Sequence, residues 1–486
     1  MFSVSSSYKT QINKKLRNQS FIKIIIYDGD YSGTTKTGTE LLRIDTSSEK
    51  NVLDVVNCVW SREIDELNTK LPVESFQFTF IDKNKMYNPE NPTSQWESIE
   101  KQAPVSFWFG YKLDNGNIEW IKGSTYITSG QNDFAVENGI CLITIKAESV
   151  ISFLTAEIQP PEGTDKVLIS GRYLDVINNV ISNSTNPMMV NGWFSCSCGS
   201  ESTSESITAF NSVTESDILQ LSAQALQCNL KTDRDGNIKI LPHSVTAETF
   251  KLDFSTFSNI PTCYKYPNLS ELTISYCPIS GGTATEESYT IYSGDYSDAD
   301  DGDWINFSIP LTDLAYNATC ISIVRYNSSG YTNGGERYIK DNEGNLGTLS
   351  ISSDRKKLEG YFTYSPINAA KIKITYSFTS VIIAEQSINI KYAISTFGQP
   401  CSIKNGLVSS ETVAQNIKKD FEYYLGLRNQ YKGIEYRGNP EIDVGDIIHV
   451  QTFYNTEVDA LVFKNEITFD GTLSGEISFY TIPPTT

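Results

Sequence analysis

Histidine is scarce in this chain of 486 residues, which has only His243 and His449, far apart in the sequence. A Ser-His-Asp triad or a His-based metal centre therefore has little to draw on. The sequence also lacks the His-Glu-x-x-His, Gly-x-Ser-x-Gly and Gly-x-x-x-x-Gly-Lys-Ser motifs. We predict no catalytic residues, no cofactor or cofactor-binding residues and no metal ligands, and a protein that is not an enzyme.

Positive charge is also in short supply, because 39 Lys and Arg residues oppose 58 Asp and Glu residues and leave a net charge of −19. Tight nucleic-acid binding needs clusters of Lys and Arg against phosphates, so this balance argues against it. An acidic surface repels a duplex, which would suit a lumen that DNA crosses without sticking. Solubility is the simpler explanation of the same charge.

Long apolar segments are missing as well. The longest run, residues 21–27, contains Lys23 and is far too short to span a bilayer. The small basic patch before it, residues 14–17, has no specificity as a targeting sequence. We expect no membrane insertion by this chain, and a protein that stays in the cytoplasm until it assembles.

Nine cysteines, an odd number without a secretory signal, do not resemble a disulfide framework. Cys196 and Cys198 form the only tight pair, and His243 is the nearest histidine. Zinc takes four ligands in structural sites, whereas this region offers two without a repeat of the spacing. Ordinary thiols are the favoured interpretation.

An acidic cluster invites a calcium proposal; its members are Asp295, Asp298, Asp300, Asp301 and Asp303. An EF-hand loop needs oxygen ligands at positions 1, 3 and 5, Gly at 6 and Glu at 12. Counted from Asp298, position 5 is Gly302 and position 12 is Ile309, so the template fails. A different calcium site near Asp298–Asp303 stays open beside the favoured solvated acidic loop.

What the chain does have is a β-rich composition, with 27 Tyr, 23 Phe and many Gly, Ser and Thr residues. Phe76, Phe78 and Phe80 alternate along one strand, which Asp82 ends. Residues 250–395 carry only short strands between turn clusters, which predicts a β-sandwich or an extension of the neighbouring sheets.

Helical spacing begins after the Pro160-Pro161 boundary. We predict a first helix with Ser170 as its N-cap and one apolar face, made of Tyr173, Leu174, Ile177, Val180 and Ile181. A second helix should begin at Thr214, with Asp217 completing a capping box. An Asp235-Gly236 hairpin follows it, and a third helix is expected after residues 409–412.

Near the C-terminus, Gly438-Asn439-Pro440 has turn chemistry, since Pro440 forces Asn439 out of the α region. We predict that Ile442 and Val444 alternate in a strand, that Gly445-Asp446 turns, and that residues 447–450 start another strand. Taken alone, this is one more hairpin in a β-rich protein.

Segments in both halves of the chain resemble bacteriophage tail baseplate hub proteins, a family that includes the N-terminal part of tail-associated lysins. The strand at residues 74–82, the Tyr87-Asn88-Pro89-Glu90-Asn91-Pro92 loop, the Pro104-Val105 strand and the strand at residues 121–128 resemble the family's first barrel. The second predicted helix followed by the Thr-Asp-Arg-Asp-Gly-x-Ile-x-Ile segment at residues 232–240 resembles its small α/β domain. The hairpin at residues 437–440 and the Phe-Asp-Gly-x-Leu-x-Gly segment at residues 469–475 resemble its second barrel.

The resemblance implies a mainly β fold with a small α/β insert. It would comprise two β-barrel tail-hub domains plus inserted α/β and β-sandwich-like regions. The expected domains are a first hub barrel at 1–160, an α/β domain at 161–250, a β-rich inserted domain at 251–395, and a helix with the second hub barrel at 396–486. Residues 251–395 match no part of the family that we recognise.

The resemblance also implies a structural hub of a phage tail or a related injection particle. Such a protein would be a homotrimer whose six barrels match a sixfold tail tube or distal tail protein above. A spike, fibre or lysin would bind below, and DNA would pass through the lumen without specific binding. The expected location is the virion baseplate, after assembly in the host cytoplasm. Trp60, Trp96 and Trp108 are candidate interface anchors, although core positions are the favoured alternative.

Two other functions stay open. The Tyr-rich residues 285–390 could contact cell-wall glycan in a receptor-binding tail protein, because aromatic faces stack on sugars. A cell-wall hydrolase would need only two carboxylates, but sequence spacing selects no pair. Tail-associated lysins carry their enzyme beyond the second barrel, where this sequence ends, which favours the structural role.

Overall fold

The computed structural model describes most of the chain. The described residues are 4–12, 19–28, 39–48, 53–65, 70–100, 102–137, 139–160, 167–190, 192–196, 205–242, 251–252, 257–259, 262–264, 269–292, 304–311, 315–326, 349–351, 357–363, 371–383, 388–394, 398–426, 429–451 and 457–482. The fold is mainly β, as the sequence predicts. His243, Cys198 and the acidic cluster at residues 295–303 lie outside the described residues.

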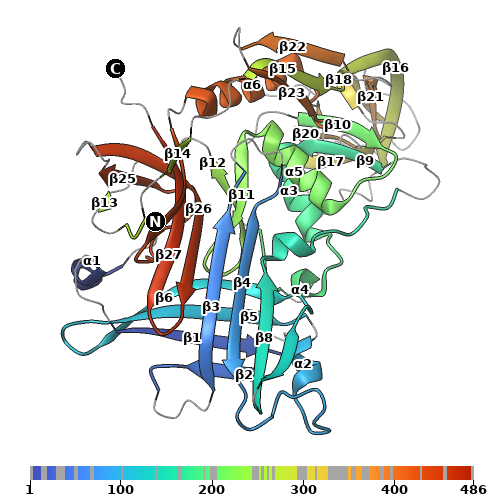
Figure 1. Cartoon of the computed structure of the whole chain (residues 1–486). Helices are drawn as coiled ribbons and strands as arrows, with labels where there is room; N and C mark the ends of the chain where they lie inside the picture. Colours follow the sequence, from blue (N-terminus) through green and yellow to red (C-terminus); the bar gives the residue numbers. More distant parts are fainter. Residues whose placement is uncertain are drawn as a thin grey trace.

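One sheet of fourteen strands forms the lower and left parts of the molecule in Figure 1. The first β module comprises β1 (Ser20–Tyr27), β2 (Glu40–Asp45), β3 (Asp54–Glu63), β4 (Val73–Ile81), β5 (Pro104–Lys112), β6 (Ile118–Thr128), β7 (Asp133–Glu137) and β8 (Ile140–Glu148). The second β module comprises β13 (Lys251–Leu252), β14 (Thr262–Tyr264), β24 (Gln430–Tyr436), β25 (Ile447–Gln451), β26 (Glu457–Phe469) and β27 (Leu473–Thr481).

The two β modules join where β26 pairs antiparallel with β3, from Lys464 opposite Glu63 to Phe469 opposite Cys58. Ile467 and Phe469 of β26 belong to the core of the first module. A strand near one end of the sequence thus completes a core built near the other end.

The first module curls around an aromatic core. Phe76, Phe78 and Phe80 are fully buried, which confirms the period-two prediction. Phe76 of β4 stacks on Phe107 of β5, with ring centroids 3.8 Å apart, although these strands are not neighbours in the sheet. Since apolar area removed from water stabilises at about 25 cal/mol per Å², this enclosed cluster is a main source of the module's stability.

The α/β module lies above the first module in Figure 1. It comprises the 3₁₀ turn η1 (Val150–Phe153), β9 (Val167–Arg172), α3 (Tyr173–Ser182), α4 (Pro187–Val190), β10 (Glu205–Phe210), α5 (Glu215–Ala225), β11 (Cys228–Thr232) and β12 (Ile238–Pro242). The face predicted for the first helix is buried in α3. The capping box of Thr214 and Asp217 at α5 is confirmed, as is the hairpin, in which Gly236 has φ +82°.

The predicted N-cap at Ser170 is wrong. Ser170 lies in β9, paired with Ile207 of β10, and Arg172 is the N-cap of α3 without a side-chain hydrogen bond. The strand runs directly into the helix, so no separate capping loop exists there.

The third predicted helix is α6 (Glu411–Gly426), and it packs with α5 in the core of the α/β module. A three-stranded sheet of β22 (Ile388–Ala393), β15 (Leu269–Tyr276) and β23 (Gln399–Lys404) contributes to the same core. Two short helices, α1 (Ser6–Ile12) and α2 (Trp96–Glu100), accompany the first β module. The domain boundaries at residues 160, 250 and 395 stay predictions.

The sandwich module, at the upper right of Figure 1, consists of two three-stranded sheets. Its strands are β16 (Ile279–Tyr292), β17 (Trp304–Pro310), β18 (Ala315–Tyr326), β19 (Leu349–Ile351), β20 (Lys357–Thr363) and β21 (Lys371–Ile383). Ile309 and Leu358 of one sheet share a small core with Ile374 and Phe378 of the other. In the described residues, no helix is both long and apolar enough to cross a membrane.

Candidate functional site

The junction loop, residues 437–446 between β24 and β25, lies where the two β modules and the α/β module meet. The prediction of a strand at Ile442 and Val444 is wrong, because this stretch is irregular. The predicted turn at Gly445-Asp446 and the following strand are confirmed. Every residue from 438 to 446 is buried. A buried loop has to satisfy its polar backbone groups with other parts of the protein.

Side chains from several elements supply those partners. The Tyr111 hydroxyl of β5 donates to the Gly438 carbonyl oxygen at 3.0 Å. The Asn465 amide of β26 donates to the Ile442 carbonyl oxygen at 2.9 Å. Gly438 has φ +63°, and a Cβ there would collide with the Ser474 carbonyl oxygen of β27. The loop therefore needs glycine at this position, both for its backbone conformation and for the close approach of β27.

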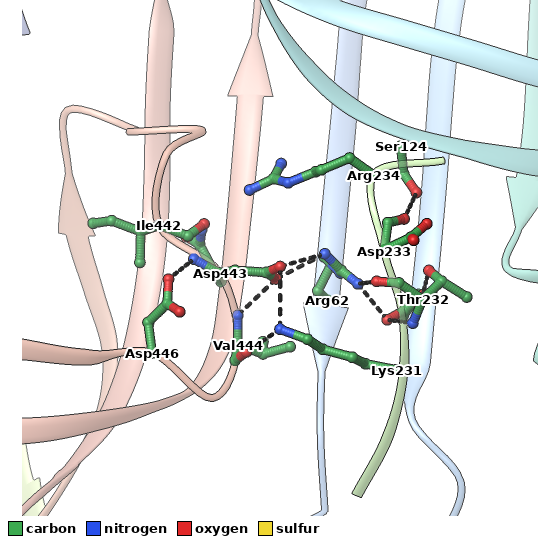
Figure 2. A network of polar contacts seen from close by, with 12 residues as sticks. Arg62, Ser124, Lys231, Thr232, Asp233, Arg234, Ile442, Asp443, Val444 and Asp446 are labelled. Atoms are coloured by element: carbon green, nitrogen blue, oxygen red, sulfur yellow. Dashed lines mark hydrogen bonds and ion pairs between the residues drawn. The ribbon is translucent and has the colours of Figure 1, made fainter. Parts of the chain in front are cut away.

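Arg62 of β3 is the centre of the polar contacts at this junction (Figure 2). Its side chain is only 1% exposed. One terminal nitrogen, Nη1, donates to both carboxylate oxygens of Asp443 in the junction loop, at 2.7 and 2.8 Å. The other, Nη2, donates to Glu74 Oε1 of β4 at 2.6 Å and to the Thr232 carbonyl oxygen of β11. One guanidinium thus joins three modules.

The partners of Arg62 are also bonded to each other and to the chain around them. The Thr232 backbone nitrogen donates to Glu74 Oε1 at 3.1 Å, and its hydroxyl donates to Glu74 Oε2. Lys231 Nζ lies 3.5 Å from Asp443 Oδ2 and donates to the Val444 carbonyl oxygen at 3.3 Å. We call these five residues the clamp: Arg62, Glu74, Lys231, Thr232 and Asp443.

Arg234 adds a second link beside the clamp (Figure 2). Its Nη1 donates to the Lys122 and Gly123 carbonyl oxygens of β6, at 3.2 and 3.1 Å. Its Nη2 donates to the Pro440 carbonyl oxygen at 2.9 Å, and its guanidinium carbon lies 4.9 Å from the centroid of the Trp60 ring. The hairpin at residues 232–238 is therefore wedged between the two β modules.

The charged neighbours of Asp443 and Arg62 keep both side chains ionised. Burial disfavours the charged form of Asp443, but the Arg62, Lys231 and Arg234 cations hold the pKa of that carboxyl well below its usual range. Burial likewise opposes the charge of Arg62, yet Asp443 and Glu74 raise its pKa. Buried charges persist only when they are paired and hydrogen-bonded, which is the case here. The clamp therefore acts as a fixed joint between modules.

The candidate anchors divide between the core and the surface. Trp60 and Trp96 are buried in the core of the first β module, which agrees with the core positions that the sequence analysis favoured over interface anchors. Trp108 is half-buried on the outer face, where Lys23 Nζ lies 4.7 Å from its ring centroid. No disulfide joins the cysteines that the structure describes, and no group of three potential metal ligands gathers among its described residues.

The sequence analysis did not predict the clamp, although the alternation of inward and outward side chains along β3 and β4 indicated part of it. Arg62 is in phase with the buried Cys58 and Trp60 of β3, and Glu74 is in phase with Phe76 of β4. Two opposite charges at inward positions of neighbouring strands predict a buried ion pair. Nothing local in the sequence indicates that Asp443 is the third partner.

Comparisons with known proteins give similarity in structure alone. No protein-family model and no curated protein matches the sequence. The 43 kDa tail protein of prophage MuSo2 from Shewanella oneidensis matches 95% of this chain over 98% of its own length, with 11% identity and a TM-score of 0.46. A tail protein from Neisseria meningitidis matches 95% of this chain over 96% of its length, with 8% identity and a TM-score of 0.45.

An Escherichia coli component of the type VI secretion system, described as structurally similar to bacteriophage T4 tail proteins, matches 90% of this chain over 76% of its length. Its identity is 10% and its TM-score is 0.38. These three solved structures are thus two tail proteins and one component of a type VI secretion system.

Proposed function

We propose that this chain is a structural hub protein of a bacteriophage tail or a related injection particle. It would form a homotrimeric ring in the virion baseplate, with the tail tube or distal tail protein above and a spike, fibre or lysin below. In this role the chain has no catalytic task, and interface area and shape carry the function.

The observation that carries this proposal is the junction itself. The segments that resemble the two hub barrels lie near opposite ends of the sequence, and they meet in one continuous sheet through β3 and β26. The hairpin that resembles the family's α/β domain supplies Lys231 and Thr232 to the clamp between them. The segments that resemble the two hub barrels and the α/β domain therefore meet at the same junction.

A fixed joint suits a ring protein for a physical reason. If three chains are to present six similar modules to a sixfold partner, the spacing of the two modules within each chain has to stay constant. Buried, paired charges favour one relative placement of the modules over others, because a shifted arrangement would leave an uncompensated charge in the interior. The net charge of −19 would also let DNA pass through the ring without sticking.

The test is the mass of the purified full chain by light scattering, followed by class averages from negative-stain images. The proposal predicts three times the chain's mass of 54.2 kDa and a ring. The ring should have an opening wide enough for duplex DNA and six similar modules on one face. A compact monomer at micromolar concentration, unchanged after addition of purified tail tube protein, would contradict the proposal.

A further inference from the structure

The short helix α1 lies across the boundary between the two β modules. Tyr8 is fully buried and packs edge-on against Tyr111 of β5, with ring centroids 5.1 Å apart. Its hydroxyl donates to Asn439 Oδ1 of the junction loop at 2.9 Å. The Ser5 backbone nitrogen before the helix donates to Glu119 Oε1 of β6 at 2.9 Å. A helix of seven residues is not stable alone in water, so α1 depends on this docking site.

Beneath α1 lies an acidic side chain that the docking site leaves poorly satisfied. The side chain of Glu441 is 1% exposed, and its two nearest donors, Lys9 and Asn439, are too poorly placed to make a well-formed hydrogen bond to either carboxylate oxygen. Lys9 Nζ of α1 lies 3.5 Å from Glu441 Oε1, but the Lys9 side chain is 48% exposed and stays largely in water. A buried carboxylate with poorly placed donors is costly, whereas the neutral acid costs much less.

The surrounding groups do not remove this cost. Burial raises the pKa of Glu441, and Lys9 and Asn439 oppose the shift without cancelling it. Burial also raises the pKa values of Tyr8, Tyr111 and Tyr436, so these hydroxyls stay neutral across the physiological range. Other acidic groups on the elements next to α1 are Glu119 of β6 and Asp114 in the turn between β5 and β6, and Asp443 and Asp446 lie in the same loop as Glu441.

We propose that α1 is a pH-sensitive latch that docks most tightly when Glu441 is protonated and loosens when Glu441 ionises. Undocking would expose Glu441 to water and bring its carboxyl back toward its ordinary behaviour. The docked state therefore binds the proton more tightly than the undocked state. Docking is strongest below the ordinary Glu value of 4.5, weakens as the pH rises to the raised pKa, and stays constant above it. The latch does not depend on whether the chain forms a ring.

The experiment is hydrogen–deuterium exchange of the full chain between pH 4.5 and pH 8, read in peptides that cover α1 and corrected for the intrinsic exchange rate. We expect the protection of α1 to fall with rising pH, by roughly tenfold for each unit by which docking raises the pKa. Glu441→Gln should remove this dependence and keep α1 as protected at pH 8 as in the wild type at pH 4.5. The exposed Glu90→Gln is the matched control and should keep the wild-type slope.

A second variant keeps the test decisive if Glu441→Gln does not fold. Lys9→Met removes the helix's cation next to the carboxylate, so it should lower the protection of α1 at pH 8 and leave it unchanged at pH 4.5. The latch is refuted if wild-type protection is independent of pH, if Glu441→Gln keeps the wild-type slope, or if Lys9→Met acts equally at both pH values.

Discussion

The two sides of the junction loop treat a buried carboxyl group in opposite ways. Asp443 faces Arg62 and Lys231 and accepts short hydrogen bonds, so its pKa lies below the usual range despite burial. Glu441, two positions earlier, faces α1, where the exposed Lys9 is a poorly placed donor, and burial raises its pKa. Burial alone therefore does not decide the charge of a carboxyl group. The donors and cations built around the group decide it.

This contrast gives the two sides different roles. The Asp443 side holds a permanent charge balance and fixes the modules in place. The Glu441 side keeps a group whose charge changes the docking of a short helix. One loop thus combines a fixed joint with an adjustable one.

The largest expected effect comes from removing the centre of the clamp. Arg62→Met leaves Glu74 and Asp443 buried without their main counter-charge and should lower the free energy of unfolding by about 3–5 kcal/mol. Denaturant unfolding at pH 7 measures this. The control is Arg43→Met, which removes an exposed arginine paired with Glu40 and should cost at most about 1 kcal/mol. Equal losses of unfolding free energy in the two variants would show that the clamp stabilises the protein no more than an exposed ion pair does.

The second prediction concerns how the stability contributed by Asp443 depends on pH. Asp443→Asn should cost about 3 kcal/mol at pH 7, because Arg62 and Lys231 lose a charged partner in the interior. The folded pKa of Asp443 is lowered, so its ionised form stabilises the protein above the unfolded pKa near 3.8, and this contribution is lost as the pH falls toward the folded value. The stability gap to the wild type should therefore be constant from pH 5 to 8 and narrow below pH 4. A gap that widens in acid would contradict this assignment.

A third change deforms the loop that carries both carboxyl groups. Gly438→Ala places a Cβ against Ser474 at a positive φ and should cost about 2 kcal/mol. Gly116→Ala is the matched control, since its φ is +84° but no atom lies within 4 Å of the added Cβ. It should cost about 1 kcal/mol. Thermal unfolding distinguishes the two, and the steric argument fails if Gly116→Ala is the more damaging change.

The smallest effect has the opposite sign. Glu441→Gln removes a poorly satisfied buried charge and should raise the free energy of unfolding by about 1 kcal/mol at pH 8. Because the folded pKa of Glu441 is raised, the wild type regains this stability as the pH falls toward 4.5, and the gain should vanish there. Denaturant unfolding at both pH values measures it. A loss of stability at pH 8 would contradict this account, because it would show that the ionised Glu441 makes a net stabilising interaction.

Local patterns in the sequence predicted the local parts of this fold. The alternation of Phe76, Phe78 and Phe80 placed one face of β4 in the core, and the capping box of Thr214 and Asp217 marked the start of α5. The N-cap failed at Ser170, because a strand that runs directly into a helix leaves no cap signal.

The junction could be predicted only in part. Turn chemistry indicated a bend at Asn439-Pro440 but not that the loop is buried, since burial there depends on the pairing of β26 with β3. Arg62 and Glu74 occupy inward-facing positions of neighbouring strands, and this alone indicates a buried ion pair. Asp443 lies 381 positions from Arg62, and no local pattern links positions so distant.

The most direct test of the clamp is a double-mutant cycle of Arg62→Met and Asp443→Asn, with the free energies of unfolding measured at pH 7. We predict that the two changes are strongly non-additive, with a coupling energy of at least about 1.5 kcal/mol, because each residue is buried mainly to serve the other. Losses that add to within about 0.5 kcal/mol would contradict the claim that this pair holds the modules together.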